Sequence, residues 1–422
     1  MKPSRSVYVA GGAITPFIGK FHPDFIWKGH PEFGKKENPT IEAMIHQVAQ
    51  QTLADTDVDG ALIDRGVIGN FVGECFVNQG HLGAMLAAAD PGFHGKPFHR
   101  VEGACASGGL ALFSGIEAIA CGAADLVLVA GAEVQTTRNA KDGADFLARA
   151  AHYEKEREID PFTFPCMFAR RTKAYLNEFG GSLEDLAPVV VKAYENANRN
   201  PNAHMREVKM TLEQASKPSD KNPTFLTNEE YKDWLKVSDC SQVSDGACAV
   251  LLASPEGLEK LGKGAERAVE IVGYGAAAGP LGEVDDLTTM GVTQAAANQA
   301  YVSAGWNATE IQVAEVHDCF SITEVLLTEA LGLCPPGSGI SFAAEGNTRL
   351  DGSIPVNTGG GLMAFGHPVG ATGVKQAFEI FRQMNQLCGD YQMPNTPIRG
   401  AAANMGGDDR TSVVTLYRKV GA

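Results

Sequence analysis

Short apolar runs alternate with segments of helical periodicity along much of the 422-residue chain. An apolar run between turn residues is typical of a buried strand, and apolar positions three or four residues apart are typical of an amphipathic helix. The first part of the chain predicts the strand Ser6–Gly11, the helix Ile41–Leu53, a strand within Ala61–Val72, the helix Leu110–Gly122 and the strand Leu126–Gly131. Strands that alternate with helices predict an α/β fold.

The second part of the chain repeats this order of elements. Its predicted elements are the strand Ala268–Gly275, the helix Thr293–Ala304, the strand Gln312–Val316, the helix Val374–Met384 and the strands Ile398–Asn404 and Ser412–Tyr417. The last of these matches Ala249–Ala253 of the first part. The repeat indicates a duplicated α/β unit, and two such units packed together place their equivalent loops at one interface.

A segment rich in charge clusters, Pro and Asn interrupts the first repeat. We predict the first part of an N-terminal half at residues 1–134, an inserted, partly helical loop domain at 135–240, the completion of the N-terminal half at 241–265 and a C-terminal half at 266–422. The insertion contains a predicted helix, Leu183–Asn198, and a basic cluster, Arg170-Arg171-Thr172-Lys173. This cluster is either a solvated helix face or a seat for the phosphates of a polyanionic substrate.

The 35 basic and 50 acidic side chains give a formal net charge of −15, which argues against general binding to nucleic acids or anionic membranes. Nine scattered cysteines without a C-x-x-C pair predict a reducing compartment and no zinc site. The N-terminus lacks the apolar core of a signal peptide, no apolar run could span a membrane, and the last three residues, Val420–Ala422, are no peroxisomal signal. We therefore expect a cytoplasmic protein.

One cysteine stands where a turn runs into a helix. The stretch Gly103–Gly109 holds Cys105 among small residues, and the helix Leu110–Gly122 follows directly. The N–H groups and the positive dipole end of a helix stabilise a thiolate and lower the pKa of such a cysteine. Cys105 is therefore predicted to be a nucleophile with a lowered pKa. The alternative is a buried structural cysteine.

Three stretches of the second part hold candidate partners for Cys105. His317-Asp318-Cys319-Phe320 follows the strand Gln312–Val316, and a glycine-dense loop with His367 opens the next helix. Both histidines are predicted at strand-to-helix turns, where functional side chains gather. The third stretch, Asn404-Met405-Gly406-Gly407, ends a strand and offers backbone N–H groups.

A cysteine, histidines and backbone N–H donors together suit acyl transfer. A histidine takes the thiol proton, a second acid or base acts on the other substrate, and each N–H donor to the oxyanion contributes about 3–4 kcal/mol. The sequence offers no metal triad and no Walker loop, and its glycine-rich segments do not match a dinucleotide fingerprint. These features favour covalent catalysis through Cys105.

The motifs resemble those of the thiolase superfamily across essentially the whole chain. The cysteine turn, the loop Gly366–Gly373 and the duplicated halves carry the resemblance, and His317-Asp318-Cys319-Phe320 is similar to the motif of the sterol-carrier-protein-X type thiolases. The resemblance implies duplicated α/β halves packed in layers, with an inserted loop domain. It also implies CoA and acyl-CoA as substrates and no metal or organic cofactor, because the thioester itself activates the α-carbon.

The resemblance assigns catalytic roles to individual residues. It implies that Cys105 is the acylated nucleophile, that His367 activates it and lines an oxyanion hole, and that His317 helps to hold the thioester oxygen, through water. Most thiolases have a second catalytic cysteine where this chain has Asn404. The X type lacks it too, and Cys319 is implied to take over its acid and base role.

Further residues are matched near the substrate. The backbone N–H groups of Cys105 and Gly406 are implied to form a second oxyanion hole. Ser241 matches a serine near the pantetheine, and Met167 and Phe320 match residues beside the acyl group. For these last three residues, plain packing or turn formation is the alternative.

The implied activity is that of a thiolase, which converts a 3-oxoacyl-CoA and CoA into acetyl-CoA or propionyl-CoA and a shortened acyl-CoA. The alternatives are a thiolase-like condensing enzyme and a non-catalytic scaffold subunit that binds acyl-CoA or lipid. The resemblance also implies a homodimer or a dimer of dimers, with the strand Leu126–Gly131 and its neighbours at the interface.

One departure from the family follows the Asn404–Gly407 stretch. Relatives continue glycine-rich and apolar, whereas this chain has Asp408-Asp409-Arg410. The two acids are expected either to repel a CoA thioester or restrict the acyl group, or to pair with Arg410 and turn away.

Overall fold

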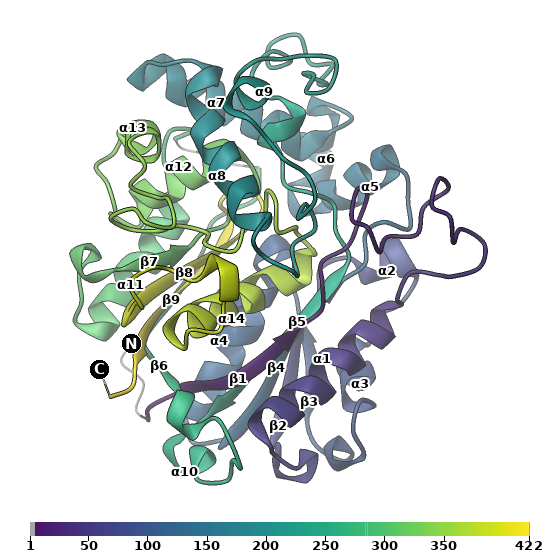
Figure 1. The fold of residues 1–422 in the computed structure, drawn as a ribbon, viewed down its shortest axis with the longest axis vertical. Helices are drawn as coiled ribbons and strands as arrows, with labels where there is room; N and C mark the ends of the chain where they lie inside the picture. The colour runs from purple at the N-terminus through teal and green to yellow at the C-terminus, as the bar shows by residue number, and fades with distance from the viewer. Residues whose placement is uncertain (1–4, 283, 285, 422) are drawn as a thin grey trace.

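The computed structural model describes residues 5–282, 284 and 286–421, in which nine strands form one mixed sheet (Figure 1). Their order across the sheet is β3-β2-β4-β5-β1-β6-β9-β8-β7. The strands are β1 (Tyr8–Ile14), β2 (Arg65–Gly69), β3 (Phe98–Val101), β4 (Leu126–Glu133), β5 (Gly246–Ala253), β6 (Val269–Ala278), β7 (Val313–Glu315), β8 (Arg399–Gly406) and β9 (Thr411–Lys419).

Helices cover the sheet and build a separate lobe above it (Figure 1). They are α1 (Ile41–Thr56), α2 (Gly73–Val77), α3 (Leu82–Ala87), α4 (Ser107–Ala120), α5 (Ala140–Leu147), α6 (Tyr153–Glu156), α7 (Thr163–Phe179), α8 (Ala187–Ala197), α9 (Leu212–Ser216), α10 (Pro255–Leu258), α11 (Gly291–Ala304), α12 (Ser321–Ala330), α13 (Gly339–Ala344) and α14 (Thr372–Met384). The lobe contains α5 to α9, which belong to the predicted insertion.

The strand order is the same in both repeats. Strands β2-β4-β5-β1 are neighbours in the first repeat and β7-β8-β9-β6 in the second, each with one parallel pair followed by antiparallel pairs. Even a register shift recurs, between Val9 and Gly11 in β1 and between Ile271 and Gly273 in β6. The predicted α/β fold of duplicated halves is confirmed.

Side chains on the two faces of β4 pack into two different hydrophobic cores. Val127 and Val129 face a cluster that contains residues of α4 and α14, whereas Leu126 and Leu128 face a cluster that contains residues of α1. Because side chains alternate along a strand, a strand covered on both faces reads as one continuous apolar run. Helices α4 and α14 consequently lie in the interior, and they bring the loops that precede them together.

Most predicted elements are confirmed with shifted ends. The predicted strand Ser6–Gly11 is β1, which continues through Gly12 to Ile14. A Cβ at Gly12 would lie 2.5 Å from the Ala249 carbonyl oxygen, so the glycine permits close strand packing there and does not mark a turn. The predicted helix Leu183–Asn198 starts with a 3₁₀ turn and becomes α-helical only in α8.

The predicted place of the subunit interface is wrong. Strand β4 lies between β2 and β5, and each of its residues is buried within this chain. A strand enclosed in this way has no surface to offer a partner. Strand β3 forms the edge of the described sheet next to β2 instead.

Residues Met1–Ser4, part of the N-terminus that is predicted not to be a signal peptide, and Ala422, the last residue of the predicted C-terminus, lie outside the described residues. Within the described part of the chain, no helix has both the length and the apolar composition needed to cross a bilayer.

Candidate active site

Cys105 lies in a single 3₁₀ turn, Ala104–Ala106, that leads directly into α4. Ser107 holds this turn: its Oγ accepts a hydrogen bond from the Gly103 N–H (3.1 Å) and donates one to the Ala104 carbonyl (2.6 Å). Ala104 has a φ of 52°, a left-handed conformation that costs a residue other than glycine about 1–2 kcal/mol. Such strain is typical of functional sites, where the surrounding structure imposes it.

The Cys105 thiol is not the thiolate that its position predicts. Burial raises the pKa of Cys105 to about 12, although a hydrogen bond from the backbone of Gly407 acts in the opposite direction. The predicted lowering of this pKa is wrong, because loss of hydration outweighs the stabilisation that the helix N-terminus gives to a thiolate. Cys105 is therefore a neutral thiol near pH 7 and needs a base.

His367 presents an unprotonated nitrogen as that base. Its Nδ1 lies 2.7 Å from Oγ1 of Thr372, and the Thr372 hydroxyl donates its proton to the Pro368 carbonyl (3.3 Å). Nδ1 must then carry the hydrogen, which leaves the lone pair on Nε2. Burial lowers the pKa of His367 to about 3, so the imidazole is neutral.

His317 carries its hydrogen on the other ring nitrogen. Oδ1 of Asn404 accepts from the Gly109 N–H (2.8 Å), so its amide nitrogen is the donor to the Cys105 carbonyl (3.1 Å) and to Nδ1 of His317 (3.0 Å). Nδ1 of His317 is thus an acceptor, and Nε2 bears the proton. This Nε2 is buried without a partner among the described residues. Burial, together with the nearby His367, lowers the pKa of His317 well below its usual value.

These three side chains meet at one point. The sulfur of Cys105 and one ring nitrogen each of His317 and His367 lie within 4.8 Å of one another, and the two rings are nearly perpendicular, with centroids 5.0 Å apart. A thiol and two imidazoles can bind zinc, but a ring nitrogen that bears a proton cannot ligate a metal. The hydrogen bonds therefore favour a site in which His317 donates an N–H to a substrate oxygen.

The loop after β7 brings Cys319 into the same cavity. Its sulfur lies 3.8 Å from Oγ1 of Thr323 in the first turn of α12. Burial, and less strongly the neighbouring Cys105, raise the pKa of Cys319 well above its usual value. Cys319 is therefore a protonated thiol beside the nucleophile. The next residue, Phe320, stacks on Phe168 of α7, with ring centroids 4.6 Å apart.

The turn between β8 and β9 closes against the Cys105 turn. A Cβ at Gly406 would lie 2.2 Å from the Gly103 carbonyl oxygen, so only glycine permits this approach. The next residue, Gly407, lines the cavity and donates a backbone hydrogen bond to Cys105. Gly407, which belongs to the stretch predicted to offer backbone N–H groups, is thus a candidate oxyanion donor beside Gly406, the residue that the resemblance singles out.

Helices α4 and α14 cross through glycines near their first turns. A Cβ at Gly108 would lie 2.8 Å from the Gly373 nitrogen, and a Cβ at Gly373 would lie 2.1 Å from the Gly109 nitrogen. Helix α4 begins just after Cys105, and α14 begins just after His367. This contact therefore sets the separation between the thiol and the imidazole.

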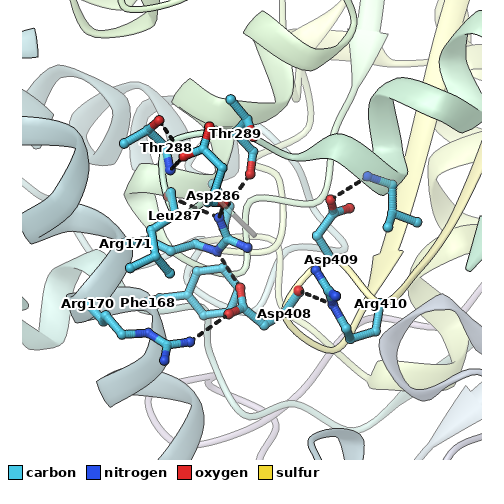
Figure 2. Close-up of polar contacts among 12 residues, drawn as sticks. Phe168, Arg170, Arg171, Asp286, Leu287, Thr288, Thr289, Asp408, Asp409 and Arg410 are labelled. Carbon is cyan, nitrogen blue, oxygen red and sulfur yellow. Dashed lines mark hydrogen bonds and ion pairs between the residues drawn. The ribbon is translucent and has the colours of Figure 1, made fainter. Parts of the chain in front are cut away.

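Asp408 forms ion pairs with two arginines of α7 (Figure 2). Its carboxylate pairs with the fully buried Arg171 of α7, and Arg170 approaches it at 3.3 Å. The Arg171 guanidinium also donates to three carbonyl groups of residues 286–289, at 2.9–3.3 Å. Arg171 is therefore neither on a solvated helix face nor part of a phosphate seat, and both expectations for it are wrong.

The Asp409 carboxylate binds the N-terminus of helix α11. Its carboxylate accepts hydrogen bonds from the N–H groups of Val292 (2.8 Å) and Thr293 (3.0 Å) in the first turn of α11, where a negative charge is favoured. Arg410 donates to the backbone carbonyls of Asp408 (2.9 Å) and Pro280 (3.1 Å). Both acids thus point away from the cavity, which is one of the two expectations for them. Their carboxylates, however, bind Arg171 and the first turn of α11 instead of the expected Arg410.

A cavity of about 400 Å³ opens over the reacting groups. The predicted site residues that line it are Cys105, Ser241, Cys319, Phe320 and His367. The Ser241 N–H donates to the Cys319 carbonyl (2.9 Å). His317 is completely buried outside the cavity wall. Met167 is buried in α7 and does not line the cavity, whereas its neighbour Phe168 does.

Two residues at the end of β4 join the repeats, and sequence reasoning missed both. Gln135 donates to the His367 carbonyl (2.7 Å). Glu133 accepts from the N–H groups of Phe71 (2.9 Å) and Gly370 (3.1 Å), and burial raises the pKa of Glu133 to about 7. The sequence signal for Glu133 was a glutamate at the end of a long apolar strand.

Two family models match the chain. The model described as thiolase, N-terminal domain, matches residues 29–256, and the model described as thiolase C-terminal domain-like matches residues 273–419. An acetyl-CoA acetyltransferase of Methanothermobacter thermautotrophicus is 36% identical over 378 residues, which are 89% of this chain and 94% of that protein. Human sterol carrier protein 2 is 27% identical over 428 residues, which are 98% of this chain and 72% of that protein.

Solved structures share the whole fold. The Ltp2-ChsH2(DUF35) aldolase aligns over 99% of both chains, with a TM-score of 0.76 and 20% sequence identity. Human mitochondrial 3-ketoacyl-CoA thiolase in complex with CoA aligns over 100% of both chains, with a TM-score of 0.71 and 17% identity. At these identities the likeness establishes the fold alone.

Proposed function

The chain belongs to the thiolase superfamily of acyltransferases, and from this premise we propose that it cleaves a 3-oxoacyl-CoA with CoA, or runs the reverse condensation, through an acyl-Cys105 intermediate. One observation carries the proposal: a neutral thiol, a histidine with a free lone pair and a histidine with a free N–H meet within 4.8 Å. The first can attack, the second can take its proton, and the third can hold the oxygen that becomes negative.

Acylation begins at Cys105. Nε2 of His367 takes the thiol proton while the sulfur attacks the C3 carbonyl carbon of the substrate. The backbone N–H groups of Cys105 and of Gly406 or Gly407 hold the resulting oxyanion. Donors of this kind are worth about 3–4 kcal/mol each. The C2–C3 bond then breaks and leaves the acyl group on sulfur.

Cys319 completes the reaction. The breaking bond leaves its electron pair on C2 as the enolate of acetyl-CoA, whose oxygen accepts the Nε2–H of His317. Cys319 is protonated in the resting protein because burial raises its pKa, so it protonates C2. Its thiolate next takes the proton of incoming CoA, which attacks the acyl-Cys105 thioester and forms the shortened acyl-CoA, while the departing Cys105 sulfur takes its proton back from His367.

The proposal includes CoA thioesters as substrates and a homo-oligomer in the cytoplasm. A structural neighbour crystallised with CoA supports the substrate class, and nine free cysteines are compatible with a reducing compartment. Strand β3 offers an open sheet edge on which a second copy can add strands. Light scattering after gel filtration measures the number of subunits.

The test is the intact mass of the protein after brief exposure to acetoacetyl-CoA without free CoA. We expect an acetyl adduct on the wild type and none on Cys105→Ala. With acetyl-CoA as donor, Cys319→Ala is expected to acquire the acetyl group but to form no acetoacetyl-CoA. Equal turnover of Cys319→Ala and wild type would refute the role of Cys319.

Other outcomes point to the alternatives. A protein that stays unmodified by acetoacetyl-CoA and by longer or branched 3-oxoacyl-CoAs is a scaffold subunit rather than a thiolase. A protein that is acylated by acyl-CoA and condenses it without ever cleaving a 3-oxoacyl-CoA is a condensing enzyme.

A further inference from the structure

Phenylalanine is the commonest residue in the wall of the cavity over Cys105. These residues include Phe71, Phe76, Phe162, Phe164, Phe168 and Phe320. They come from the first repeat, from the first turns of α7 with the residue before it, and from the loop after β7. A wall of aromatic rings favours an apolar guest, and it favours an aromatic guest most, because rings gain from edge-to-face and offset contacts beyond their buried area.

Cys105 itself belongs to this aromatic part of the wall. It packs in one apolar cluster with Phe71, Phe76, Phe164 and Val369. Whatever is bonded to the Cys105 sulfur therefore meets these rings first. In a thiolase reaction that group is the acyl group.

Two residues with charged side chains, both basic, lie in the wall. Lys20 and Arg138 line the cavity and are exposed to solvent, and the described wall contains no carboxylate. Asn139 and Gln242 add amide groups. Cations and amides suit the phosphates and amides of CoA, so the polar part of the wall matches the CoA arm and leaves the aromatic part to the acyl group.

Building on the proposed function, we propose that the acyl group carried by Cys105 contains an aromatic ring, so that the substrates are 3-aryl-3-oxopropionyl-CoA thioesters. The Cys105 sulfur adds to the aryl ketone carbon and its proton passes to His367. The C2–C3 bond breaks, and its electron pair takes the Cys319 proton to give acetyl-CoA and an aroyl thioester. Free CoA then gives its proton to Cys319 and attacks the aroyl carbonyl carbon, which breaks the bond to Cys105 and forms aroyl-CoA, while the Cys105 sulfur recovers its proton from His367.

The first experiment compares 3-oxo-3-phenylpropionyl-CoA with acetoacetyl-CoA on the wild-type protein. We expect a benzoyl adduct on Cys105 and a kcat/KM about 10- to 100-fold higher for the phenyl substrate, which is the selectivity that apolar contacts of this size provide. An acetyl adduct with no benzoyl adduct, or equal kcat/KM values, overturns this inference alone. No adduct from either substrate, nor from longer or branched 3-oxoacyl-CoAs, overturns the proposed function as well.

A cavity-filling variant tests where the ring binds. Gly143 of α5 lines the cavity, and a Cβ there would meet only the ring of Phe76, at 3.7–4.0 Å, which is ordinary contact. Gly143→Leu therefore fills the cavity without a backbone clash, and leucine favours helix more than glycine does. We expect kcat/KM to fall about tenfold or more for the phenyl substrate and less than about threefold for acetoacetyl-CoA.

Gly291→Leu is the matched control. Gly291 is exposed in the first turn of α11, and a Cβ there would meet nothing within 4 Å. The control should leave both kcat/KM values at the wild-type level. If Gly143→Leu lowers both substrates equally, this part of the cavity holds the CoA arm, and the inference is overturned.

Discussion

Asn404 decides which nitrogen of His317 carries a proton. Its amide is oriented by the Gly109 N–H on one side and the Cys105 carbonyl on the other, so its NH₂ group must face Nδ1 of His317. A neutral histidine has one donor and one acceptor. Fixing Nδ1 as the acceptor makes Nε2 a donor, as a binding site for a developing oxyanion requires.

The substitution Asn404→Asp tests this assignment. A carboxylate can only accept, so it stabilises the tautomer with hydrogen on Nδ1 and turns Nε2 of His317 into an acceptor. We expect kcat to fall about 100- to 1,000-fold with little change in KM. A rise in KM at unchanged kcat would contradict the assignment, and thermal unfolding checks that the variant folds.

The reactivity of Cys105 should depend on pH in a characteristic way. Because burial raises the pKa of Cys105 to about 12, the thiolate is a minor species at neutral pH. The rate of Cys105 alkylation by iodoacetamide, measured by peptide mapping, is expected to rise about tenfold per pH unit between pH 6 and 9 without a plateau. A plateau within this range would mean a lowered pKa.

At the scale of elements, helix α7 and the β8–β9 turn act as one unit. Phe168 of α7 lines the cavity, and Arg171, one turn later, pairs with Asp408 directly after Gly407. The same guanidinium holds the segment 286–289 ahead of α11 (Figure 2). The inserted lobe is thus tied to the turn that closes against the nucleophile.

Breaking this ion pair should be costly. Arg171 and Asp408 are both almost fully buried, so Arg171→Met removes the buried partner of this carboxylate and leaves it only the partly exposed Arg170. We expect the free energy of unfolding, measured in urea, to fall by about 3–5 kcal/mol. The double variant Arg171→Met/Asp408→Leu should lose less than the single one, because it removes both charges.

Arg170→Met provides the matched control on the same helix. Arg170 keeps 24% of its side-chain surface exposed, and a pair of this kind contributes about 0–1 kcal/mol. Losses of equal size for Arg170→Met and Arg171→Met would contradict the structural role of Arg171.

The order of strands and helices could be predicted from the sequence, whereas contacts between residues far apart in the sequence could not. Local periodicity gave the strands, the helices and the repeat, and it gave Cys105, His317 and His367 because each precedes a helix. Arg171 and Asp408 lie 237 positions apart, and nothing local pairs them. The raised pKa of Cys105 likewise depends on burial by other segments, and the same holds for the choice of Phe168 over Met167 at the cavity.

At the scale of the whole molecule, the proposed catalytic groups come from both repeats. Strands β1 and β6 join the half-sheets at their end strands, while Glu133 at the end of β4 and Gln135 just after that strand hold the loop that contains His367 and Gly370 in the second repeat. The distance between nucleophile and base therefore depends on how the repeats are docked.

Glu133 should make this docking sensitive to pH. Burial raises its pKa from 4.5 to about 7, so between these values the folded protein binds a proton that the unfolded chain has lost. Stability then falls as the pH rises through this window. Relative to Glu133→Gln, the wild type should lose about 3 kcal/mol of unfolding free energy from pH 4.5 to 7. A difference independent of pH would refute the shift.

The glycine contact between α4 and α14 limits how this enzyme can change. Any methyl group added at Gly108 or Gly373 would push the two helices apart and carry Cys105 away from His367. The spacing of Cys105 and His367 therefore cannot change gradually, and substitutions can accumulate only in cavity walls that belong to neither helix. New substrate preferences should accordingly arise in α5, in α7 and in the loops around the cavity, while the chemistry stays the same.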